Sequence, residues 1–300
     1  MIMDVTSSVV QKVVRRLIHG QDYRVEVITV LDSQFLEYAV DFFKKVIEAK
    51  LQNQQVTMDW YKKELLDPNL PSNDIAIHAG LNKKTISNMY NSTRKEIIVD
   101  ASEKHYNELY ELINRIVEDG SELDITLTIK FRGVSVDLNM NESLIVINTL
   151  AVKRSAFRGG NYSKIGKRVE VPLMTALCKL FQVPSKHYTL QQKPKSRREV
   201  DFYLLGHDLE KKYRGEVKLM GKGNPESADA VIARDSDIFV ADKLSDLNKE
   251  QLTDLGVEWV ELRAVNGYRR FFTILQRLDI PCHDFTGMLN TELDTIFESS

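Results

Sequence analysis

Two acidic residues and a lysine stand at a spacing that suits metal-assisted chemistry. Asp201 lies in the apolar segment Glu199–Leu205, and Glu216 and Lys218 lie in the next one, Tyr213–Met220. Each segment is short and apolar enough for a strand, and side chains alternate between the two faces of a strand. Glu216 and Lys218 therefore share one face. If the apolar face of the sheet is buried, two carboxylates and an amine lie together on the other.

This combination predicts a magnesium site. Mg²⁺ prefers oxygen ligands, is held by few carboxylates and keeps waters that a substrate phosphate can replace. Asp201 and Glu216 would be the ligands of the metal. The amine of Lys218 would lower the pKa of a metal-bound water and stabilise the charge that builds on the phosphorus centre. The expected reaction is hydrolysis of a phosphodiester.

The elements that must position these residues follow a long helical region. From about residue 25 to 119, apolar residues recur at intervals of three and four, which indicates helices. Strict alternation in residues 123–131 and 134–138, around Arg132-Gly133, predicts a β-hairpin. Leu144–Ile147 is a candidate third strand.

The remainder alternates between helices and strands. We expect a break at residues 158–160, then a helix at Val169–Phe181 with Pro172 near its first turn, where a missing N–H costs little. Further on we expect helices at 225–233, 245–255 and 268–278, and strands at 199–205, 213–220, 237–241 and 257–262. The fold class is thus mixed α and β. We place a helical domain at 1–120 and an α/β catalytic domain at 121–300 with its core at about 165–262; the boundary moves to 150 if the hairpin belongs with the helices.

Residues 72–93 are a helix-turn-helix candidate. Ala76 stands four residues before Gly80, and Ile86 six residues after it. A small residue is needed where two helices cross, glycine permits a left-handed turn, and the apolar residues Ile75, Ala79, Leu81, Ile86 and Met89 would close the core. The second helix would present to a DNA groove the side chains of Lys83, Lys84, Thr85, Ser87 and Asn88. A structural helical cluster that touches no DNA would show the same apolar spacing.

Charge is distributed unevenly along the chain. The whole sequence carries a net charge of −2, but residues 151–200 contain twelve Lys and Arg against two Glu. A local cationic excess is the expected footprint of a polyanion, because neutralised phosphates release counterions; a solvated basic surface is the alternative. We expect phosphate contacts between Lys153 and Arg198 and in the glycine-rich segment after residue 220. The candidates are Arg158, Lys164, Lys167, Arg168, Lys195, Arg197 and, in the second segment, Lys222.

Over residues 165–242 the pattern resembles the PD-(D/E)xK nuclease superfamily. The shared features are Asp201 followed by Glu216-x-Lys218 and the element order αβββαβ around a mixed central sheet. Val200 stands where the name-giving proline would be, and that proline is a variable element. The resemblance implies that Glu170, on the helix before the strands, assists at the active site; stabilisation of its own helix N-terminus is the alternative.

More narrowly, three segments resemble the CfrBI-type group of type II restriction endonucleases. These are Arg158-Gly-Gly, residues 163–174 and residues 216–229. The resemblance implies a Mg²⁺-dependent, site-specific deoxyribonuclease that cuts both strands of a short duplex site, acts as a homodimer and leaves 5′-phosphate ends. It also implies a cognate DNA methyltransferase as a functional partner.

Two other classes of function stay open. A helix-turn-helix regulator whose α/β half only dimerises would bind DNA without Mg²⁺ and would not cut it. A repair nuclease of the same superfamily would recognise DNA structure or ends rather than sequence. A disulfide framework or a Cys/His zinc site is not expected, because the chain has only two cysteines and no C-x-x-C pair. No run of eighteen apolar residues occurs, so we expect a cytoplasmic protein of a bacterial or archaeal cell, with no membrane partner.

Overall fold

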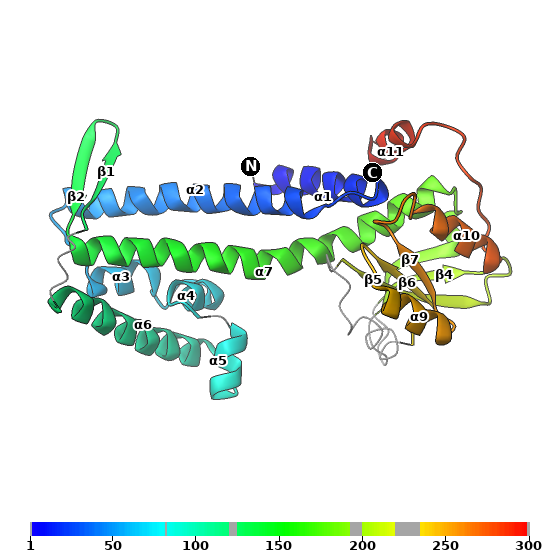
Figure 1. The fold of residues 1–300 in the computed structure, drawn as a ribbon. Coiled ribbons are helices and arrows are strands. Elements are labelled where there is room, and N and C mark those ends of the chain that lie inside the picture. The colour runs from blue at the N-terminus through cyan, green and yellow to red at the C-terminus, as the bar shows by residue number, and fades with distance from the viewer. Residues whose placement is uncertain (1, 82, 120–124, 193–199, 220–234, 299–300) are drawn as a thin grey trace. The chain divides into compact units, whose positions relative to one another are not determined.

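The computed structural model describes residues 2–81, 83–119, 125–192, 200–219 and 235–298. Within these ranges the side chains of residues 2–6, 83–84, 158–165 and 191–192 are outside the description. The chain forms two compact units, one of residues 31–161 and one of residues 1–30 with 162–300. The long helices α2 (Arg24–Leu51) and α7 (Met140–Leu180) contribute residues to both units (Figure 1).

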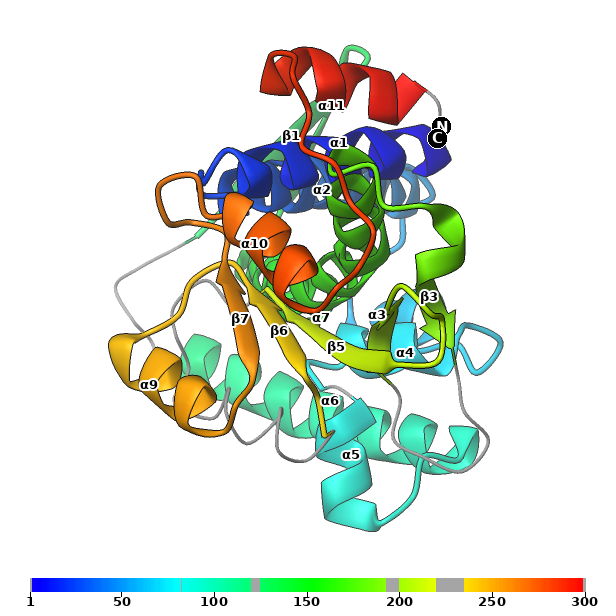
Figure 2. The same cartoon turned by 90° about the vertical axis from the view of Figure 1, so that its right-hand side faces the viewer.

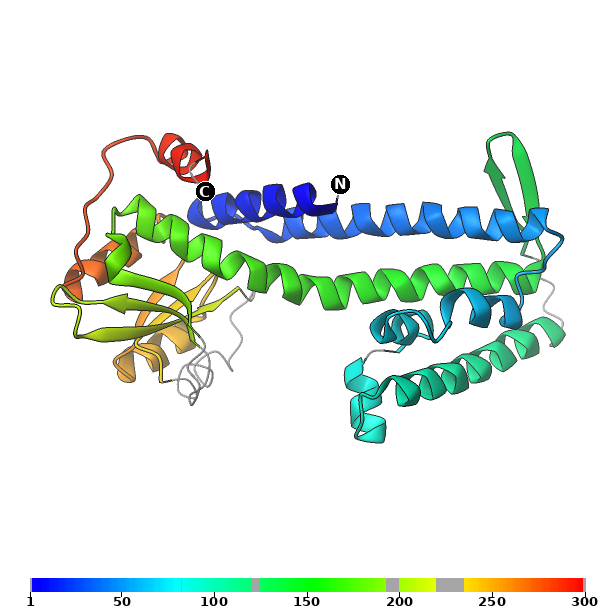
Figure 3. The ribbon, with the colours of Figure 1, turned by 180° about the vertical axis from the view of Figure 1, so that it is seen from behind.

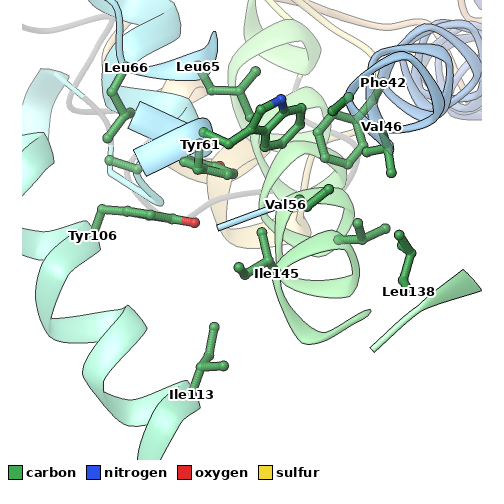
Figure 4. Packing of buried hydrophobic residues seen from close by; sticks show 14 of the residues in the cluster. Phe42, Val46, Val56, Tyr61, Leu65, Leu66, Tyr106, Ile113, Leu138 and Ile145 are labelled. Carbon is green, nitrogen blue, oxygen red and sulfur yellow. The ribbon is translucent and has the colours of Figure 1, made fainter. Parts of the chain in front are cut away.

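The predicted helical region is confirmed in the unit of residues 31–161. After α2 come α3 (Met58–Leu65), α4 (Ser72–His78), α5 (Lys83–Tyr90) and α6 (Lys95–Glu118). Aromatic and aliphatic residues of α2, α3, α6 and α7 interlock in one core (Figure 4), in which Tyr61 stacks on Tyr106 with ring centroids 4.0 Å apart. Apolar burial at these positions is what holds short helices such as α3 in place, since isolated helices of this length are unstable in water.

The predicted hairpin is also confirmed. Strands β1 (Leu127–Phe131) and β2 (Val134–Leu138) pair in antiparallel register from Leu127–Leu138 to Phe131–Val134. The two turn residues, Arg132 and Gly133, both have positive φ, 49° and 82°. This backbone geometry matches the twist of the flanking strands, which is why a glycine is favoured there.

Three predictions about residues 140–180 are wrong. Leu144–Ile147 is not a strand, residues 158–160 do not break the helix, and Pro172 lies deep inside α7 rather than in its first turn. A four-residue apolar run fits a strand or a buried helix equally well. The helix wins because Asn139 and Glu142 form a capping box, in which each backbone N–H donates to the other's side chain at 3.0 Å.

The second unit contains a mixed five-stranded sheet, in the order β3-β4-β5-β6-β7 (Figure 2). Its strands are β3 (Tyr188–Gln192), β4 (Val200–Leu205), β5 (Lys212–Lys218), β6 (Ile238–Ala241) and β7 (Glu258–Glu261). Strand β4 pairs antiparallel with both β3 and β5, whereas β6 pairs parallel with both β5 and β7. Four of these strands were predicted; β3 was not. All four residues of β6 are buried, as expected for a central parallel strand that is covered on both faces.

Helices complete this unit. Helix α9 (Asp246–Asp254) begins at Ser245, whose hydroxyl caps Asn248 N, and its chain reverses at Gly256 with φ 70°. Helix α10 (Arg269–Arg277) follows β7, and a short 3₁₀ turn (Ser185–His187) precedes β3. The predicted helices at 245–255 and 268–278 are therefore confirmed. The predicted helix at 225–233 lies outside the described residues.

The N-terminal segment belongs with the sheet, which corrects the predicted division at residue 120. Helix α1 (Ile2–Ile18) and the turn after it are part of the sheet unit, whereas the hairpin and the first half of α7 are part of the helical one. The last helix, α11 (Leu289–Glu298), lies beside α1 (Figure 3), where Arg15 forms an ion pair with Asp294 and His19 contacts Asn290 at 2.7 Å. The described helices include none that is long and apolar enough to cross a membrane.

Candidate functional site

Asp201 and Glu216 lie on adjacent strands where the two strands separate. The last backbone pair between β4 and β5 is Phe202–Gly215, so one further step would set Asp201 opposite Glu216. The backbone pairing stops there, and the Asp201 carboxylate takes its place: Oδ2 accepts the N–H of Val217 at 2.8 Å. Asp201 is thereby fixed beside the strand that carries Glu216. Residues opposite each other in an antiparallel pair project from the same face.

Glu216 and Lys218 do share a face and contact each other. The Nζ of Lys218 lies 3.2 Å from Oε1 of Glu216. The Glu216 side chain is fully buried, while that of Lys218 is 32% exposed. A buried carboxylate is tolerated only beside a compensating charge or hydrogen-bond donor. The site therefore has an acid at its floor and an amine that reaches toward solvent.

Glu170 of α7 belongs to the same cluster. Burial and the negative charges of Asp201 and Glu216 raise the pKa of its carboxyl to about 7, against the opposing effect of Lys218 and Lys167. These charges act on Glu170 only because they are near it. The four residues that the sequence singled out for catalysis thus come together, from α7, β4 and β5. A carboxyl with a pKa near neutrality can hold or release a proton at physiological pH.

The donor set fits a magnesium ion better than a metal that needs a complete protein cage. Within the described ranges, no group of three or more His, Cys, Asp or Glu side chains is arranged to hold a metal. The two carboxylates of Asp201 and Glu216 meet the usual protein contribution to a Mg²⁺ site, in which waters and substrate phosphate complete the octahedron. Neither histidine nor thiolate lies in the cluster, which disfavours zinc.

The basic segment divides into exposed and buried parts. Lys167 and Arg168 are exposed on α7, close in sequence to Glu170. Lys153 differs from the expected phosphate contacts: its amine lies over the ring of Tyr38, 4.6 Å from the centroid, and 3.3 Å from Nε2 of His78. The amine of Lys153 is thus engaged within the helical unit. The remaining predicted phosphate contacts lie outside the described side chains: Arg158, Lys164, Lys195, Arg197 and Lys222.

Helices α4 and α5 meet at a turn, as expected for residues 72–93. Gly80 has φ 84°, and Ala76 and Ile86 are fully buried against Ile98 of α6. Met89 was expected in this core but is 64% exposed, so that expectation is wrong; α6 supplies the apolar contact instead. On α5, Asn88 is exposed and Thr85 and Ser87 are half-buried, while the side chains of Lys83 and Lys84 lie outside the description. A role of α5 in reading DNA stays a prediction.

Sequence reasoning missed two residues that shape the site. Gly215 has no room for a side chain, because a Cβ there would lie 1.9 Å from Cζ of Phe202; a glycine inside a strand is a signal of such close packing. Tyr23 donates its hydroxyl to the carbonyl of Leu219 at 3.1 Å, immediately after Lys218. No local pattern could link Tyr23 with Leu219, because they are 196 residues apart.

The sheet, with its acids and lysine at the junction of β4 and β5, defines a protein of the nuclease class when it is combined with the family comparison. The model of the CfrBI restriction endonuclease family matches residues 7–249. The chain belongs to this family, and its narrower resemblance to CfrBI-type enzymes is confirmed. No curated protein and no solved structure matches the chain.

Proposed function

We propose that this protein is a Mg²⁺-dependent type II endonuclease that hydrolyses both strands of a short, specific duplex DNA site. The observation that carries the proposal is the convergence of Glu170, Asp201, Glu216 and Lys218 at the point where β4 and β5 separate. Membership of a restriction endonuclease family supports the same reaction. A PD-(D/E)xK active site, which the sequence resembles, would account for both.

Asp201 and Glu216 would hold the metal. When bound there, Mg²⁺ supplies a Lewis acid for the scissile phosphate and lowers the pKa of a water ligand. The Asp201 carboxylate keeps its orientation because Val217 N–H donates to one of its oxygens, leaving the other for the metal. A carboxylate fixed in this way loses little conformational freedom when the metal binds.

Lys218 and Glu170 would handle charge and protons. The ammonium of Lys218 stabilises negative charge on the attacking oxygen and on the phosphate in the transition state. Glu170, with a pKa of about 7, holds a proton at the edge of the cluster and can accept or return one during turnover. Attack of water on the phosphorus with departure of the O3′ oxygen would break the P–O3′ bond and leave 5′-phosphate and 3′-hydroxyl ends.

The DNA partner would be double-stranded. Lys167 and Arg168 are exposed beside Glu170, and phosphate contacts there would draw the backbone toward the acids. Helix α5 would read bases through its polar residues, most directly through Asn88. A homodimer would bring one site to each strand, and a cognate methyltransferase would protect the host's own sites.

The first test is incubation of the full-length protein with phage DNA in Mg²⁺ and in EDTA, followed by electrophoresis. Discrete fragments that need Mg²⁺ support the proposal, and their ends should accept label from polynucleotide kinase only after phosphatase treatment. A smear would favour a repair nuclease. Intact DNA with retarded migration would favour a regulator that binds through α4 and α5.

A matched pair of lysine variants tests the active site. Lys218→Ala should abolish cleavage and retain DNA binding. The control is Lys212→Ala. Lys212 lies at the other end of the same strand, where its amine is 3.8 Å from the ring centroid of Tyr203. This variant should cleave DNA as the wild type does. Normal cleavage by Lys218→Ala would refute the assigned role.

A further inference from the structure

Among the described residues, the end of β5 that carries Glu216 and Lys218 is paired with a strand on one side only. On one side, β6 pairs with β5 as far as Lys218–Ala241. On the other side, pairing with β4 stops at Phe202–Gly215. The backbone groups that point to that side beyond Gly215 therefore need other partners, because buried N–H and C=O groups are costly when they are not hydrogen-bonded.

The hydrogen bonds of β5 with its neighbours show which of its N–H and C=O groups point away from β6. Arg214 O accepts the N–H of Asp237, just before β6, so the even-numbered residues of β5 direct their backbone groups toward β6. In a strand the direction alternates with each residue. The odd-numbered residues Val217 and Leu219 consequently direct their N–H and C=O groups toward the side of β5 on which β4 lies.

Two side chains form hydrogen bonds with these backbone groups. The Asp201 carboxylate accepts Val217 N–H at 2.8 Å, and the Tyr23 hydroxyl donates to Leu219 O at 3.1 Å. These contacts lie on either side of Lys218 along the chain. Tyr23 is 2% exposed, so its hydroxyl bond is protected from competition by water.

Tyr23 sits on a rigid support. Its neighbour Asp22 accepts Nε of Arg24 at 2.8 Å and lies 3.5 Å from the guanidinium of Arg263, in the segment after β7. Gly20 packs so closely on this segment that a Cβ would be 3.2 Å from the carbonyl oxygen of Ala264. The turn between α1 and α2 is thus attached to the carboxyl end of the sheet within the same compact unit.

We propose that Tyr23 is a positioning residue for the nuclease reaction: by holding Leu219 O, it fixes the end of β5 and so the placement of Glu216 and Lys218. The proposal rests on the proposed function for its effect on DNA cleavage. Small displacements of reacting groups reduce rates strongly, so loss of this one bond should lower turnover more than it lowers stability or DNA affinity.

The test compares Tyr23→Phe with Tyr213→Phe in the full-length protein. Each variant removes one hydroxyl that donates to a backbone carbonyl and leaves the ring in place; the Tyr213 hydroxyl contacts Leu278 O at 3.2 Å, near the opposite end of β5. Tyr23→Phe should lower kcat about tenfold with KM within about twofold of wild type. Tyr213→Phe should leave kcat within about twofold, with a similar loss of thermal stability. Equal kcat in the two variants would overturn the proposal.

A second readout does not depend on activity. Hydrogen–deuterium exchange in metal-free, DNA-free protein should rise for the amides of residues 216–219 in Tyr23→Phe and stay unchanged there in Tyr213→Phe. Unchanged exchange in Tyr23→Phe overturns the positioning role. If the wild type fails to cut any DNA, the proposed function fails and the catalytic part of this inference fails with it, whereas the exchange result still decides whether Tyr23 holds β5.

Discussion

The ring of Phe202, the residue after Asp201 in β4, lies directly on the backbone of Gly215, the residue before Glu216 in β5. A Cβ at residue 215 would lie 1.9 to 2.3 Å from three ring carbons of Phe202. Phe202 itself is fully buried, so the ring cannot move into solvent. Glycine at this position leaves room for the Phe202 ring on the face of the sheet.

Gly215→Ala should destabilise the protein by about 1–3 kcal/mol, because overpacking a buried site forces side chains and backbone to shift. It should also reduce cleavage, since Glu216 is the next residue. Urea unfolding and a cleavage assay measure the two effects. Gly206→Ala is the control, because the nearest atom to a Cβ there is 3.5 Å away. Equal stabilities of the two variants would contradict the packing argument.

Glu142 connects the start of α7 with the end of α2 inside the helical unit. Its oxygens accept Lys50 Nζ at 3.0 Å, Val56 N at 2.9 Å and Asn139 N at 3.0 Å. Burial opposes ionisation, but these donors outweigh it and lower the pKa of Glu142 below its usual value. Truncation would leave three donors without their acceptor.

Glu142→Ala should therefore cost about 3–5 kcal/mol, as is typical when one member of a buried ion pair is removed. Glu111→Ala removes an exposed carboxylate that pairs with Arg115 one turn along α6, and it should cost less than about 1 kcal/mol. Chemical denaturation of both variants checks the difference. A loss below about 1 kcal/mol in Glu142→Ala would show that the network contributes little.

The sequence predicted the arrangement of Glu216 and Lys218 on β5 better than it predicted the helices. Period-two alternation was enough to put Glu216 and Lys218 on one face, because strand faces depend only on local geometry. The length of α7 was not accessible in the same way. Its interior contains Pro172 and a Gly-Gly pair, which locally disfavour helix. Beyond Pro172 the helix buries apolar residues such as Leu173 and Leu177, and this tertiary packing favours the helix.

Long-range contacts were the other limit. That residues 1–30 join the sheet follows from bonds such as Tyr23–Leu219, which no periodicity encodes. The capping box at Asn139, by contrast, was a readable signal, since Asn followed three residues later by Glu is typical of a helix start. Read in that way, it argues for a helix at Leu144–Ile147 rather than a strand.

Lys167 and Arg168 offer a direct test of DNA contact. Both are exposed, and each phosphate contact contributes about one unit to the dependence of log affinity on log salt. Lys167→Ala or Arg168→Ala should weaken binding to all duplex sequences and reduce the salt slope by about 1. Fluorescence anisotropy at several salt concentrations, in Ca²⁺ or EDTA, gives the slope.

Lys153→Met is the control for this measurement. Its amine is engaged with Tyr38, Phe157 and His78 in the helical unit, so the variant should lose stability and keep the wild-type salt slope. If Lys153→Met reduces the salt slope and Lys167→Ala leaves it unchanged, the DNA backbone does not lie along the exposed part of α7.

His78 gives the helical unit a defined response to acid. Burial, together with the nearby positive charge of Lys153, lowers the pKa of His78 to about 4 from its usual 6.5. The neutral ring fits its surroundings: Nδ1 lies 2.8 Å from Leu65 O, to which it can donate, and Nε2 faces the Lys153 amine.

Above pH 6.5 the ring is neutral in both the folded and the unfolded chain, and its contribution to stability is complete. As pH falls from 6.5 to 4, the unfolded chain binds a proton that the folded chain does not, so the free energy of unfolding should decrease by about 3 kcal/mol from this residue. His78→Asn can keep the hydrogen bond to Leu65 O without titrating.

The difference in unfolding free energy between wild type and His78→Asn, measured in urea from pH 7.5 to pH 4.5, should therefore shift steadily in favour of the variant as the pH falls. Lys153→Met removes the neighbouring charge and should narrow this pH window. Parallel curves for wild type and His78→Asn would show that His78 takes up its proton equally in both states.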